Sequence, residues 1–458
     1  MSLLTQKNPF TGDVIETFTL DSIDQVNQKI TSLCQSQLKW KQTPLQTRIE
    51  GVKNAMRYFE VNKQKISEDI CEAIGRPLHQ CFGEIRGFFE RAEYLCSEAS
   101  LALADDVFGD KPGFERKITH EPLGTIFVIS AWNYPLLITV NSVIPALISG
   151  NTVLLKHSSL TPTIGRHFEK AFANINGIEP LLLQTVCTHE TTGKIIENSP
   201  IDHVIFTGSV HGGQKITQHC AKRFFHPTLE LGGKDAAYIH KDADVAAAAA
   251  SVVDGAMFNS GHSCCGIERA YAHEDIYDSF IQECQKLIQA YQLGDPKNEN
   301  TNLGPLAQAK SADFLQQQIA EACNSGAKVL CGGQIQHIQK GTFWSPTLVV
   351  DVDHSMGIMK EENFAPILPV MKVENENEAI RLINDCDYGL TTALFTRDPI
   401  LARKWATQIN TGTVFMNRCD YLDPALPWAG RKNSGIGSSL SKYSYKNLTR
   451  TKSIHFKL

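Results

Sequence analysis

The residues best suited to chemistry lie in one short turn, residues 259–269, which reads NSGHSCCGIER. Two adjacent cysteines, Cys264 and Cys265, stand there among glycine and serine, directly after a helix-length apolar segment. A disulfide between neighbouring residues is strained, so the two are not expected to bridge each other. A single cysteine is usually structural, but an accessible thiol in a turn of small residues can act as a nucleophile. The turn is therefore the first candidate for covalent catalysis.

Two further segments could serve such a nucleophile. Glu230 precedes a Gly-Gly turn and could act as a general base, although a glutamate in that setting is often a surface or capping residue. Residues 205–213, IFTGSVHGG, read as a strand, a turn and a helix that begins near Gln214. Glycine lets the backbone approach a phosphate, and a helix N-terminus attracts it. The spacing is not G-x-G-x-x-G, so the turn alone is also consistent with a plain connection.

Alternating helices and strands must position these segments. Apolar residues three to four apart predict helices, and short β-branched runs between helix-length segments predict a parallel sheet covered on both faces. The predicted helices are 49–59, 85–94, 245–258, 276–291, 314–325 and 401–410. The predicted strands are 124–130, 152–156, 204–207, 236–239, 346–352, 367–373 and 412–416.

Length and composition limit the function classes. The 458 residues exceed what one hydrophobic core holds, so two or three packed units are expected. A hydrophobic fraction of 42% and a net charge of −5 favour a globular protein without a nucleic-acid or membrane surface. The longest apolar run, 245–253, is too short for a bilayer, and residues 1–10 do not resemble a secretory signal. Thirteen cysteines without a C-x-x-C pair favour a cytoplasmic protein with mostly inert thiols.

Six segments together resemble motifs of the aldehyde dehydrogenase superfamily, in the same order and over essentially the whole chain. Six motifs in order are highly specific, so the resemblance outweighs the structural explanations of each segment alone. The segments are 132–135 (WNYP), 206–213 (FTGSVHGG), 229–234 (LELGGK), 261–264 (GHSC), 361–366 (EENFAP) and 427–435 (PWAGRKNSG).

The resemblance implies a mechanism of the non-acylating type. Cys264 would attack the aldehyde as a thiolate, and the Asn133 side-chain amide and the Cys264 backbone N–H would hold the oxyanion. After hydride transfer to a nicotinamide, Glu230 would activate the water that hydrolyses the thioester. The Cys265 side chain is expected to point elsewhere. No metal site is expected, because no His/Cys cluster has ligand spacing.

The same resemblance implies contacts for NAD or NADP. Lys156 would meet the adenosine ribose, Glu362 would hold the nicotinamide ribose, and Phe364 would pack against the nicotinamide end. Ser209 and the Gly208 turn would meet the pyrophosphate. The remaining expected contacts are Ser130, Trp132, Ser159, Thr207, Gly213 and Leu231.

One departure from the family pattern concerns cofactor choice. NAD-preferring members commonly carry a glutamate three residues after the lysine, where this chain has Ser159. A glutamate would repel a 2′-phosphate, whereas serine offers a donor beside the positive charge of Lys156. The sequence therefore predicts that NADP is accepted. The alternative is that serine only weakens ribose binding and that NAD remains the working cofactor.

Two other departures lie near the reacting groups. His262 replaces the usual glutamine two residues before Cys264, and it either tunes the thiol or is a turn residue. Ala365 replaces a glycine, and its methyl group could shift the loop that carries Glu362 and Phe364.

The substrate is poorly specified. Family members that bind short carboxylated aldehydes, such as succinic semialdehyde, often carry an arginine at the position of Asn141. In the loop after the strand 412–416, Arg418 could bind a carboxylate, and Asp420 and Asp423 could favour a cationic aldehyde. Alternatively these three residues form an internal salt-bridge network. An apolar or aromatic lining is suggested by Tyr134 and Trp428.

Two rival functions remain to be weighed. An acylating dehydrogenase would pass the acyl group to coenzyme A or phosphate, but an intact LELGGK segment with Glu230 favours water as the acceptor. A non-catalytic binding protein on the same scaffold would be expected to have lost Cys264, Glu230 or Asn133, and all three are present.

The resemblance also implies an architecture: a doubly wound Rossmann-like cofactor domain, an α/β catalytic domain and a small β oligomerisation element. The last would combine a hairpin at 106–121 with a C-terminal strand at 451–456, which suits strand addition to another subunit. We expect a homodimer or homotetramer. The expected boundaries are 1–104 and 123–232 for the NAD(P)-binding domain, 233–440 for the catalytic domain, and 105–122 with 441–458 for the oligomerisation element.

Overall fold

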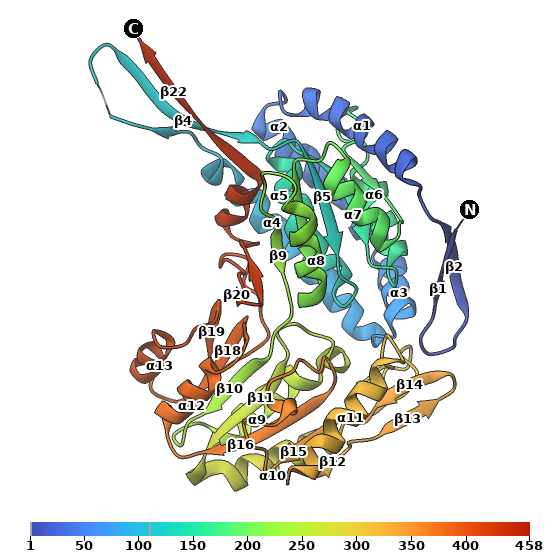
Figure 1. Cartoon of the computed structure of the whole chain (residues 1–458), viewed down its shortest axis with the longest axis vertical. Coiled ribbons are helices and arrows are strands. Elements are labelled where there is room, and N and C mark those ends of the chain that lie inside the picture. Colours follow the sequence, from blue (N-terminus) through green and yellow to red (C-terminus); the bar gives the residue numbers. More distant parts are fainter. Residues whose placement is uncertain (1, 110) are drawn as a thin grey trace.

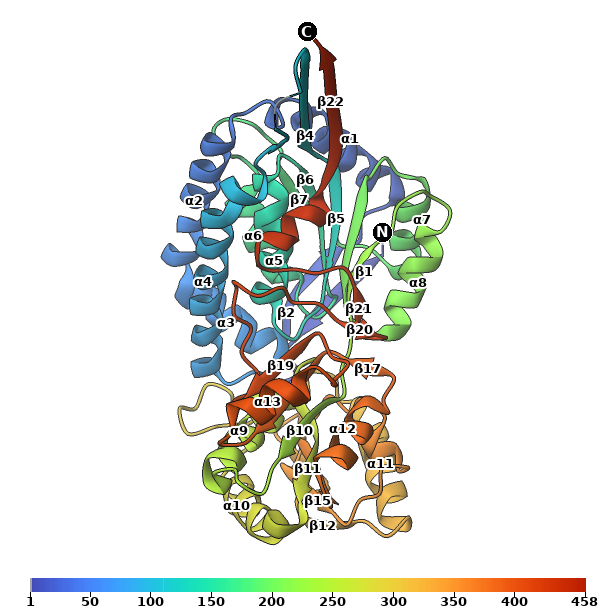
Figure 2. The same cartoon turned by 90° about the vertical axis from the view of Figure 1, so that its left-hand side faces the viewer.

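A computed structural model of the chain describes residues 2–109 and 111–458. Two lobes lie one above the other, and an arm of paired strands projects from the upper lobe (Figure 1). In the view turned by 90°, the C-terminal segment climbs from the lower lobe along the upper lobe to the arm (Figure 2). Within the described residues, no helix combines the length and apolar character needed to cross a bilayer.

The upper lobe is built on a six-stranded sheet with the order β21-β9-β8-β5-β6-β7. The five strands from β9 to β7 are parallel, and β21 pairs antiparallel at the edge. The strands are β5 (Thr125–Ser130), β6 (Thr152–His157), β7 (Leu182–Gln184), β8 (His203–Thr207), β9 (Thr228–Glu230) and β21 (Gly435–Ile436). The chain passes outward through β6 and β7 and returns on the other side of β5. Ligands of doubly wound sheets bind at the carboxyl ends of the strands beside such a switch point.

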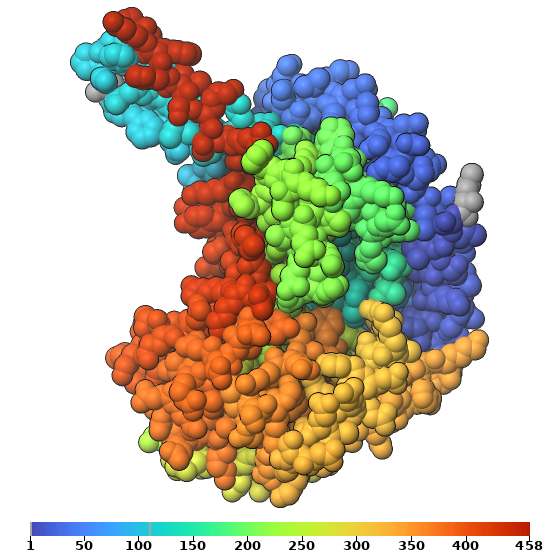
Figure 3. Space-filling model, viewed as in Figure 1, coloured from blue at the N-terminus to red at the C-terminus, as the bar shows by residue number. Residues whose placement is uncertain are grey.

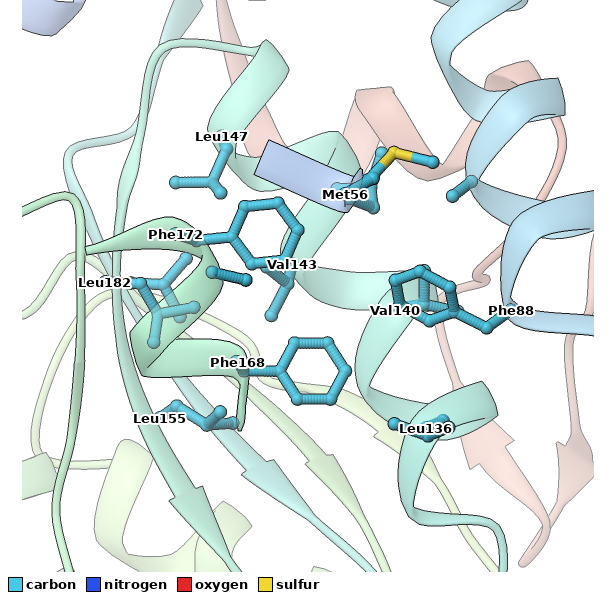
Figure 4. Close-up of a cluster of buried hydrophobic side chains, with 14 of the residues drawn as sticks. Met56, Phe88, Leu136, Val140, Val143, Leu147, Leu155, Phe168, Phe172 and Leu182 are labelled. Carbon is cyan, nitrogen blue, oxygen red and sulfur yellow. The ribbon is translucent and has the colours of Figure 1, made fainter. Parts of the chain in front are cut away.

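Helices cover this sheet on both faces (Figure 1). They are α1 (Ile23–Trp40), α2 (Leu45–Val61), α3 (Lys63–Ile74), α4 (Leu78–Ala102), α5 (Pro135–Ile148), α6 (Pro162–Phe172), α7 (His189–Asn198) and α8 (Val210–Cys220). In α5, apolar residues three to four apart send Val140, Val143 and Leu147 to one side, where they are buried near Phe168 and Phe172 of α6 (Figure 4). Each such burial contributes about 1.5–3 kcal/mol. This packing fixes α5, which begins directly after the WNYP segment.

The lower lobe holds a second, seven-stranded sheet with the order β12-β15-β16-β11-β10-β18-β19, parallel except for β12. Its strands are β10 (Asp235–Ile239), β11 (Ile267–His273), β12 (Lys328–Cys331), β15 (Thr347–Val350), β16 (Ile367–Val373), β18 (Thr391–Phe395) and β19 (Thr413–Met416). Its helices are α9 (Val245–Met257), α10 (Tyr277–Gln289), α11 (Ser311–Asn324), α12 (Glu376–Asn384) and α13 (Pro399–Ala406).

Shorter pairs complete the fold. They are β1 (Leu3–Lys7) with β2 (Val14–Thr19), β13 (Ile335–Ile338) with β14 (Gly341–Trp344), and β17 (Tyr388–Gly389) with β20 (Arg431–Lys432). Short 3-10 turns are η1 (Phe258–Gly261), η2 (Glu274–Ile276), η3 (Gly357–Met359) and η4 (Lys442–Leu448).

The arm consists of β22 (Thr449–Lys457), β4 (Phe114–Pro122) and the short β3 (Asp106–Val107). β22 pairs antiparallel with β4 from Thr449 opposite Pro122 to Lys457 opposite Phe114. The space-filling view shows this arm standing clear of the body (Figure 3). The predicted combination of an early hairpin with a C-terminal strand is therefore confirmed.

Several predicted helix bounds are wrong. The helices predicted at 49–59 and 85–94 are α2 and α4, which extend further at both ends, to Leu45–Val61 and Leu78–Ala102. α8 begins at Val210 rather than near Gln214, because the hydroxyl of Ser209 caps it by accepting from the Gly212 N–H at 3.1 Å. The helix predicted at 401–410 is α13, which begins earlier, at Pro399 after an Asp398 cap, and ends at Ala406.

Candidate active site

Most of the predicted site residues lie at one edge of the upper sheet. Because β5, β6, β8 and β9 are parallel, the segments that follow them meet at their carboxyl ends. These ends carry Ser130, Trp132 and Asn133 after or on β5, Lys156 and Ser159 on or after β6, Thr207, Gly208 and Ser209 on or after β8, and Glu230 at the end of β9.

The lower lobe contributes through the amino ends of its strands. Residues 231–234 connect β9 to β10, the cysteine turn runs into β11, and the EENFAP segment runs into β16. β10, β11 and β16 are parallel neighbours, so these three connections lie together. The two lobes thus bring five of the six motifs, distant in sequence, to one level of the molecule.

The cysteine turn has an unusual backbone. Asn259, Ser260 and Gly261 have φ values of 54°, 55° and 72°, in the left-handed region that residues other than glycine seldom adopt. Such strain persists only where the surroundings enforce it. Here the Asn259 side-chain amide donates to the carbonyl oxygens of His262 and Asn133, both at 3.1 Å. The turn that presents the cysteines is therefore held from both sides.

The Gly-Gly turn of LELGGK allows two close approaches. A Cβ on Gly233 would lie 2.4 Å from the carbonyl oxygen of Cys264, and one on Gly232 would lie 2.4 Å from the carboxylate of Glu362. Side chains at these positions would push both neighbours away. The Gly233 N–H donates to Glu362 Oε1 at 3.0 Å, so this turn connects the cysteine turn with the EENFAP loop.

Asn133 is held by buried charges that the sequence analysis missed. Its side-chain amide donates to the His262 carbonyl oxygen at 3.2 Å. Its own carbonyl accepts from the guanidinium of Arg76, which also donates to Asn259 at 2.8 Å and pairs with Glu84. The signal that could have revealed them is that charged residues flank or enter the otherwise apolar face of α4.

Glu230 and Cys264 line the same cavity, which has a volume of about 410 Å³. Glu230 Oε2 accepts from the Thr207 hydroxyl at 3.4 Å, and Oε1 is buried without a hydrogen-bond partner among the described residues. Burial raises the pKa of Glu230 above its usual range. A carboxyl with a raised pKa and a free oxygen can accept a proton from a water in this cavity.

Three rings pack beside the cysteine turn. The His262 ring centroid lies 5.0 Å from that of Trp132 and 6.0 Å from that of Phe364, and the last two lie 5.7 Å apart. Burial lowers the pKa of His262 to about 3, so the imidazole is neutral near pH 7. His262 is therefore an aromatic turn residue. Because its imidazole does not titrate near neutral pH, it does not tune the thiol by changing charge there.

A second buried ion pair supports the EENFAP loop. Glu268 pairs with Lys234 at 2.9 Å and accepts the backbone N–H groups of Asn363 and Phe364, both at 2.9 Å. Phe364 has a left-handed φ of 52°, while the neighbouring Ala365 is buried and is not among the residues with positive φ. The alanine that replaces glycine therefore introduces no backbone strain. No sequence pattern marks Glu268 or Lys234 as supports of this loop.

Glu362 faces this pair from the loop. Burial and the nearby Glu268 raise the pKa of Glu362 to about 8. The predicted ribose contact thus lies against the Gly-Gly turn, at the junction of the two lobes.

The predicted dinucleotide positions form a second group around β6 and α8. Lys156 is buried, burial lowers the pKa of its ammonium, and no ion pair or hydrogen bond of this ammonium occurs within the described residues. Ser159 is exposed nearby in sequence. A Cβ on Gly208 would lie 2.6 Å from the Phe206 ring, and one on Gly213 would lie 2.7 Å from Leu231. These small residues keep the N-terminus of α8 close to the sheet.

The loop after β19 differs from the expectation. The internal salt-bridge network predicted for Arg418, Asp420 and Asp423 does not form in the described part of the chain. Arg418 instead lies 4.2 Å over the Tyr421 ring, and Asp420 turns into the cavity, where its Oδ1 accepts from the Cys265 thiol at 3.2 Å. Cys265 therefore also lines the cavity rather than pointing away from it.

Tyr134 and Trp428 both contribute to the cavity wall, in agreement with the apolar or aromatic lining expected from the sequence. All thirteen cysteines are free, and seven of them are buried.

Comparisons with known proteins cover the whole chain. A sequence profile described as the aldehyde dehydrogenase family matches residues 2–454. Lactaldehyde dehydrogenase of Escherichia coli (strain K12) is 30% identical over 450 residues, 98% of this chain and 94% of that protein. A succinate-semialdehyde dehydrogenase (NADP(+)) of Deinococcus radiodurans is 29% identical over 445 residues, covering 97% and 93%. The crystal structure of the E. coli lactaldehyde dehydrogenase matches with a TM-score of 0.96 at 29% identity, covering 100% and 96%. The predicted fold class is confirmed.

Proposed function

Because the chain belongs to the aldehyde dehydrogenase family and is an NAD(P)-dependent enzyme that oxidises aldehydes, we propose that Cys264 is its nucleophile, with Glu230 as general base and Asn133 as oxyanion donor. The observation that carries this assignment is that Cys264 and Glu230, far apart in the sequence, line one cavity of about 410 Å³. Asn133 contacts the same turn through the His262 carbonyl.

The residues at the carboxyl edge of the upper sheet fit a dinucleotide. The N-terminus of α8 offers backbone N–H groups close to Gly208 and Ser209, a site suited to a pyrophosphate. Lys156 is a buried cation without a partner in the described residues, and Glu362 would hold a ribose at the lobe junction. The other proposed contacts are Ser130, Trp132, Ser159, Thr207, Gly213, Leu231 and Phe364. NAD(P)+ would supply the hydride acceptor for the oxidation.

The chain's own groups would act in sequence. The Cys264 thiolate attacks the carbonyl carbon, and the new oxyanion is held by the Asn133 side-chain amide and the Cys264 N–H. Loss of hydride leaves a thioester on Cys264. Glu230 then takes a proton from water, and the hydroxide attacks the thioester carbon, releasing the acid and restoring the thiolate.

For the cofactor, we propose that NADP is accepted. The exposed Ser159 presents no negative charge to a 2′-phosphate, and the cation of Lys156 lies on the preceding strand. A matched comparison of kcat/KM for NAD and NADP with one aldehyde tests this. A preference for NAD of about tenfold or more, roughly 1.4 kcal/mol, contradicts it.

We also propose that residues 1–104 and 123–232 form the NAD(P)-binding domain, 233–440 the catalytic domain, and 105–122 with 441–458 the oligomerisation element. The chain would form a homodimer or homotetramer that assembles through the arm. β22 leaves its outer edge without a strand partner among the described residues, and its side chains are mostly exposed. An open strand edge suits pairing with another copy of the chain. Size-exclusion chromatography with light scattering, before and after deletion of residues 449–458, tests the assembly: a monomer in the intact chain contradicts it.

The catalytic assignment is tested by following NAD(P)H formation with a panel of aldehydes. Cys264→Ala is expected to lower turnover at least about 10³-fold, because the covalent route is lost. Cys265→Ala is the matched control, since it removes the adjacent thiol, and it is expected to stay within about tenfold of the wild type. If turnover survives in Cys264→Ala and disappears in Cys265→Ala, the nucleophile is Cys265 and the proposed assignment is wrong.

A further inference from the structure

One buried cation in the cavity has no partner of opposite charge in the part of the chain that the structure describes. Arg91 lies on α4, is 8% exposed, and lines the same cavity as Cys264 and Glu230. Its Nη1 donates to the Leu137 carbonyl oxygen at 3.1 Å and to Asn141 Oδ1 at 3.3 Å, and both acceptors are neutral. Within the described residues, no carboxylate comes within 4 Å of this guanidinium and no acceptor meets its Nε or Nη2.

Apart from Lys156, which is assigned to the proposed dinucleotide site, the other buried cations are satisfied by the described chain. Arg76 pairs with Glu84, and Lys234 pairs with Glu268. Among the described residues Arg269 has no ion pair, but it uses all three nitrogens on carbonyl and hydroxyl oxygens. Removing a guanidinium from water is costly unless its donors are satisfied. Since the described chain leaves donors of Arg91 unused in a cavity wall, their acceptor is expected to come from a molecule bound there.

The charge balance of the cavity selects the kind of acceptor. Four carboxyls also line it. Glu84 is balanced by its ion pair with Arg76, and burial raises the pKa of Asp420 to about 7 and that of Glu230 above its usual range, which makes both less acidic than exposed carboxyls. Glu90 and Arg86 are exposed to solvent, where screening reduces their influence. A guanidinium stays protonated throughout. The fixed charge in the cavity is therefore positive, and a carboxylate matches its planar donors.

We propose that Arg91 binds the carboxylate of the substrate, so that the enzyme oxidises short aldehydes that carry a carboxylate at the far end. This inference rests on the proposed function, because it requires the aldehyde carbon to reach Cys264 while the carboxylate meets Arg91. The reaction then yields a dicarboxylate. Arg91 determines specificity through substrate binding and takes no part in the proton or hydride transfers.

The test compares matched substrates. Semialdehydes of three to six carbons with a terminal carboxylate are set against unsubstituted aldehydes of similar length, with NAD(P)H formation as the signal. The wild type is expected to favour one carboxylated member at least about 30-fold in kcat/KM. Arg91→Gln is expected to lose about 100-fold with that substrate, the scale for removing one side of a buried charge pair, and less than about threefold with its neutral counterpart.

Two further variants keep the test decisive. Arg91→Lys retains the charge without the planar fork, so it is expected to recover part of the loss if Arg91→Gln folds poorly. Arg418→Gln is the matched control, since Arg418 is an exposed arginine of the nearby loop, and it is expected to change the preference less than about threefold. Calorimetric binding of succinate to Cys264→Ala, with and without Arg91→Gln, provides a readout that does not require turnover.

The possible failures are distinguishable. Cys264-dependent turnover of neutral and carboxylated aldehydes with equal kcat/KM would overturn the role of Arg91 and leave the proposed function intact. An equal loss with both substrates in Arg91→Gln and Arg91→Lys would also overturn it. Absence of Cys264-dependent turnover with any aldehyde would remove the proposed function itself.

Discussion

Two arginines near the same helix have opposite surroundings. Arg76, just before α4, uses Nε, Nη1 and Nη2 on Asn259, Glu84 and the Asn133 carbonyl. Arg91, halfway along α4, uses only Nη1 and faces the cavity. Both are buried, so burial alone does not distinguish a charge that maintains the framework from one that serves a ligand. The distinguishing property is whether the chain itself satisfies every donor.

The same contrast separates the carboxyls. Glu84 and Glu268 are paired with cations and accept backbone N–H groups, so they fix the segments that carry Asn133 and Phe364. Glu230 and Asp420 line the cavity, have no cation within ion-pair distance in the described chain, and have raised pKa values. We call Glu84 and Glu268, with their cations, framework charges, and removing one of them is expected to lower stability most. Removing the cavity carboxyls Glu230 or Asp420 is expected to lower turnover or to raise stability.

The largest expected effect is on the framework. Arg76→Met leaves Glu84 buried without its cation, which is expected to cost about 3–5 kcal/mol of folding stability. Turnover should fall as well, because the Asn133 backbone loses its anchor. Thermal denaturation and steady-state rates measure both effects. Arg86→Met, an exposed arginine of α4, is the control and is expected to change stability by less than about 0.5 kcal/mol. Equal melting temperatures for the two variants would contradict the comparison.

Replacement of the cavity carboxyl Glu230 is expected to change the rate of turnover most. Glu230→Gln cannot take a proton from water, so kcat is expected to fall about 10²–10³-fold while the acyl group accumulates on Cys264. In the wild type, Glu230 is active only when ionised. Its raised pKa therefore places the acid limb of the kcat profile above the usual range of a glutamate, with rates falling as the pH falls through it. This limb should vanish from the residual activity of Glu230→Gln.

Mass spectrometry of the variant during turnover would detect the trapped acyl group. An unchanged pH profile, or no acyl-enzyme, would mean that another group activates the water.

The smallest effect is expected at Asp420. Its pKa is raised to about 7 in the folded state, so the protein loses stability as the pH rises from the ordinary range of an aspartate through about 7. Asp420→Asn removes that loss, and we expect it to be more stable than the wild type at pH 8, with little difference at pH 4. Melting temperatures across this range give the answer. The exposed Asp423→Asn is the control, and a gain of equal size there would show that Asp420 is not specially placed.

The sequence predicted the elements that carry strong patterns. β5, β6 and β16 are apolar runs buried on both faces, and their predicted bounds agree with the structure within one residue. The hairpins β1–β2 and β13–β14 escaped prediction because they are short, partly exposed and only weakly alternating. The N-cap Ser209, whose hydroxyl accepts from Gly212 three residues along the chain, decides where α8 begins, and apolar periodicity alone does not show such a cap.

The candidate site was predictable only where motifs exist. The order of six motifs brought Cys264, Glu230 and Asn133 to attention, whereas Arg76 and Arg91 belong to no motif that we recognised. What distinguishes the two arginines is the partners of their guanidinium nitrogens. These partners depend on how α4 packs against α5 rather than on any local pattern. The wrong network around Asp420 has the same origin, because charges close in sequence do not reveal which of them turn inward.

The pairing of β21 with β9 has a consequence for biosynthesis. Gly435 lies opposite Glu230, so the strand that ends at the proposed base acquires its outer neighbour only after the whole lower lobe has been made. A ribosome-bound chain that ends before residue 435 exposes one edge of β9, and open edges invite wrong pairings. Contacts between such distant residues also form slowly. The upper lobe begins first along the chain, yet its sheet is completed among the last events of folding.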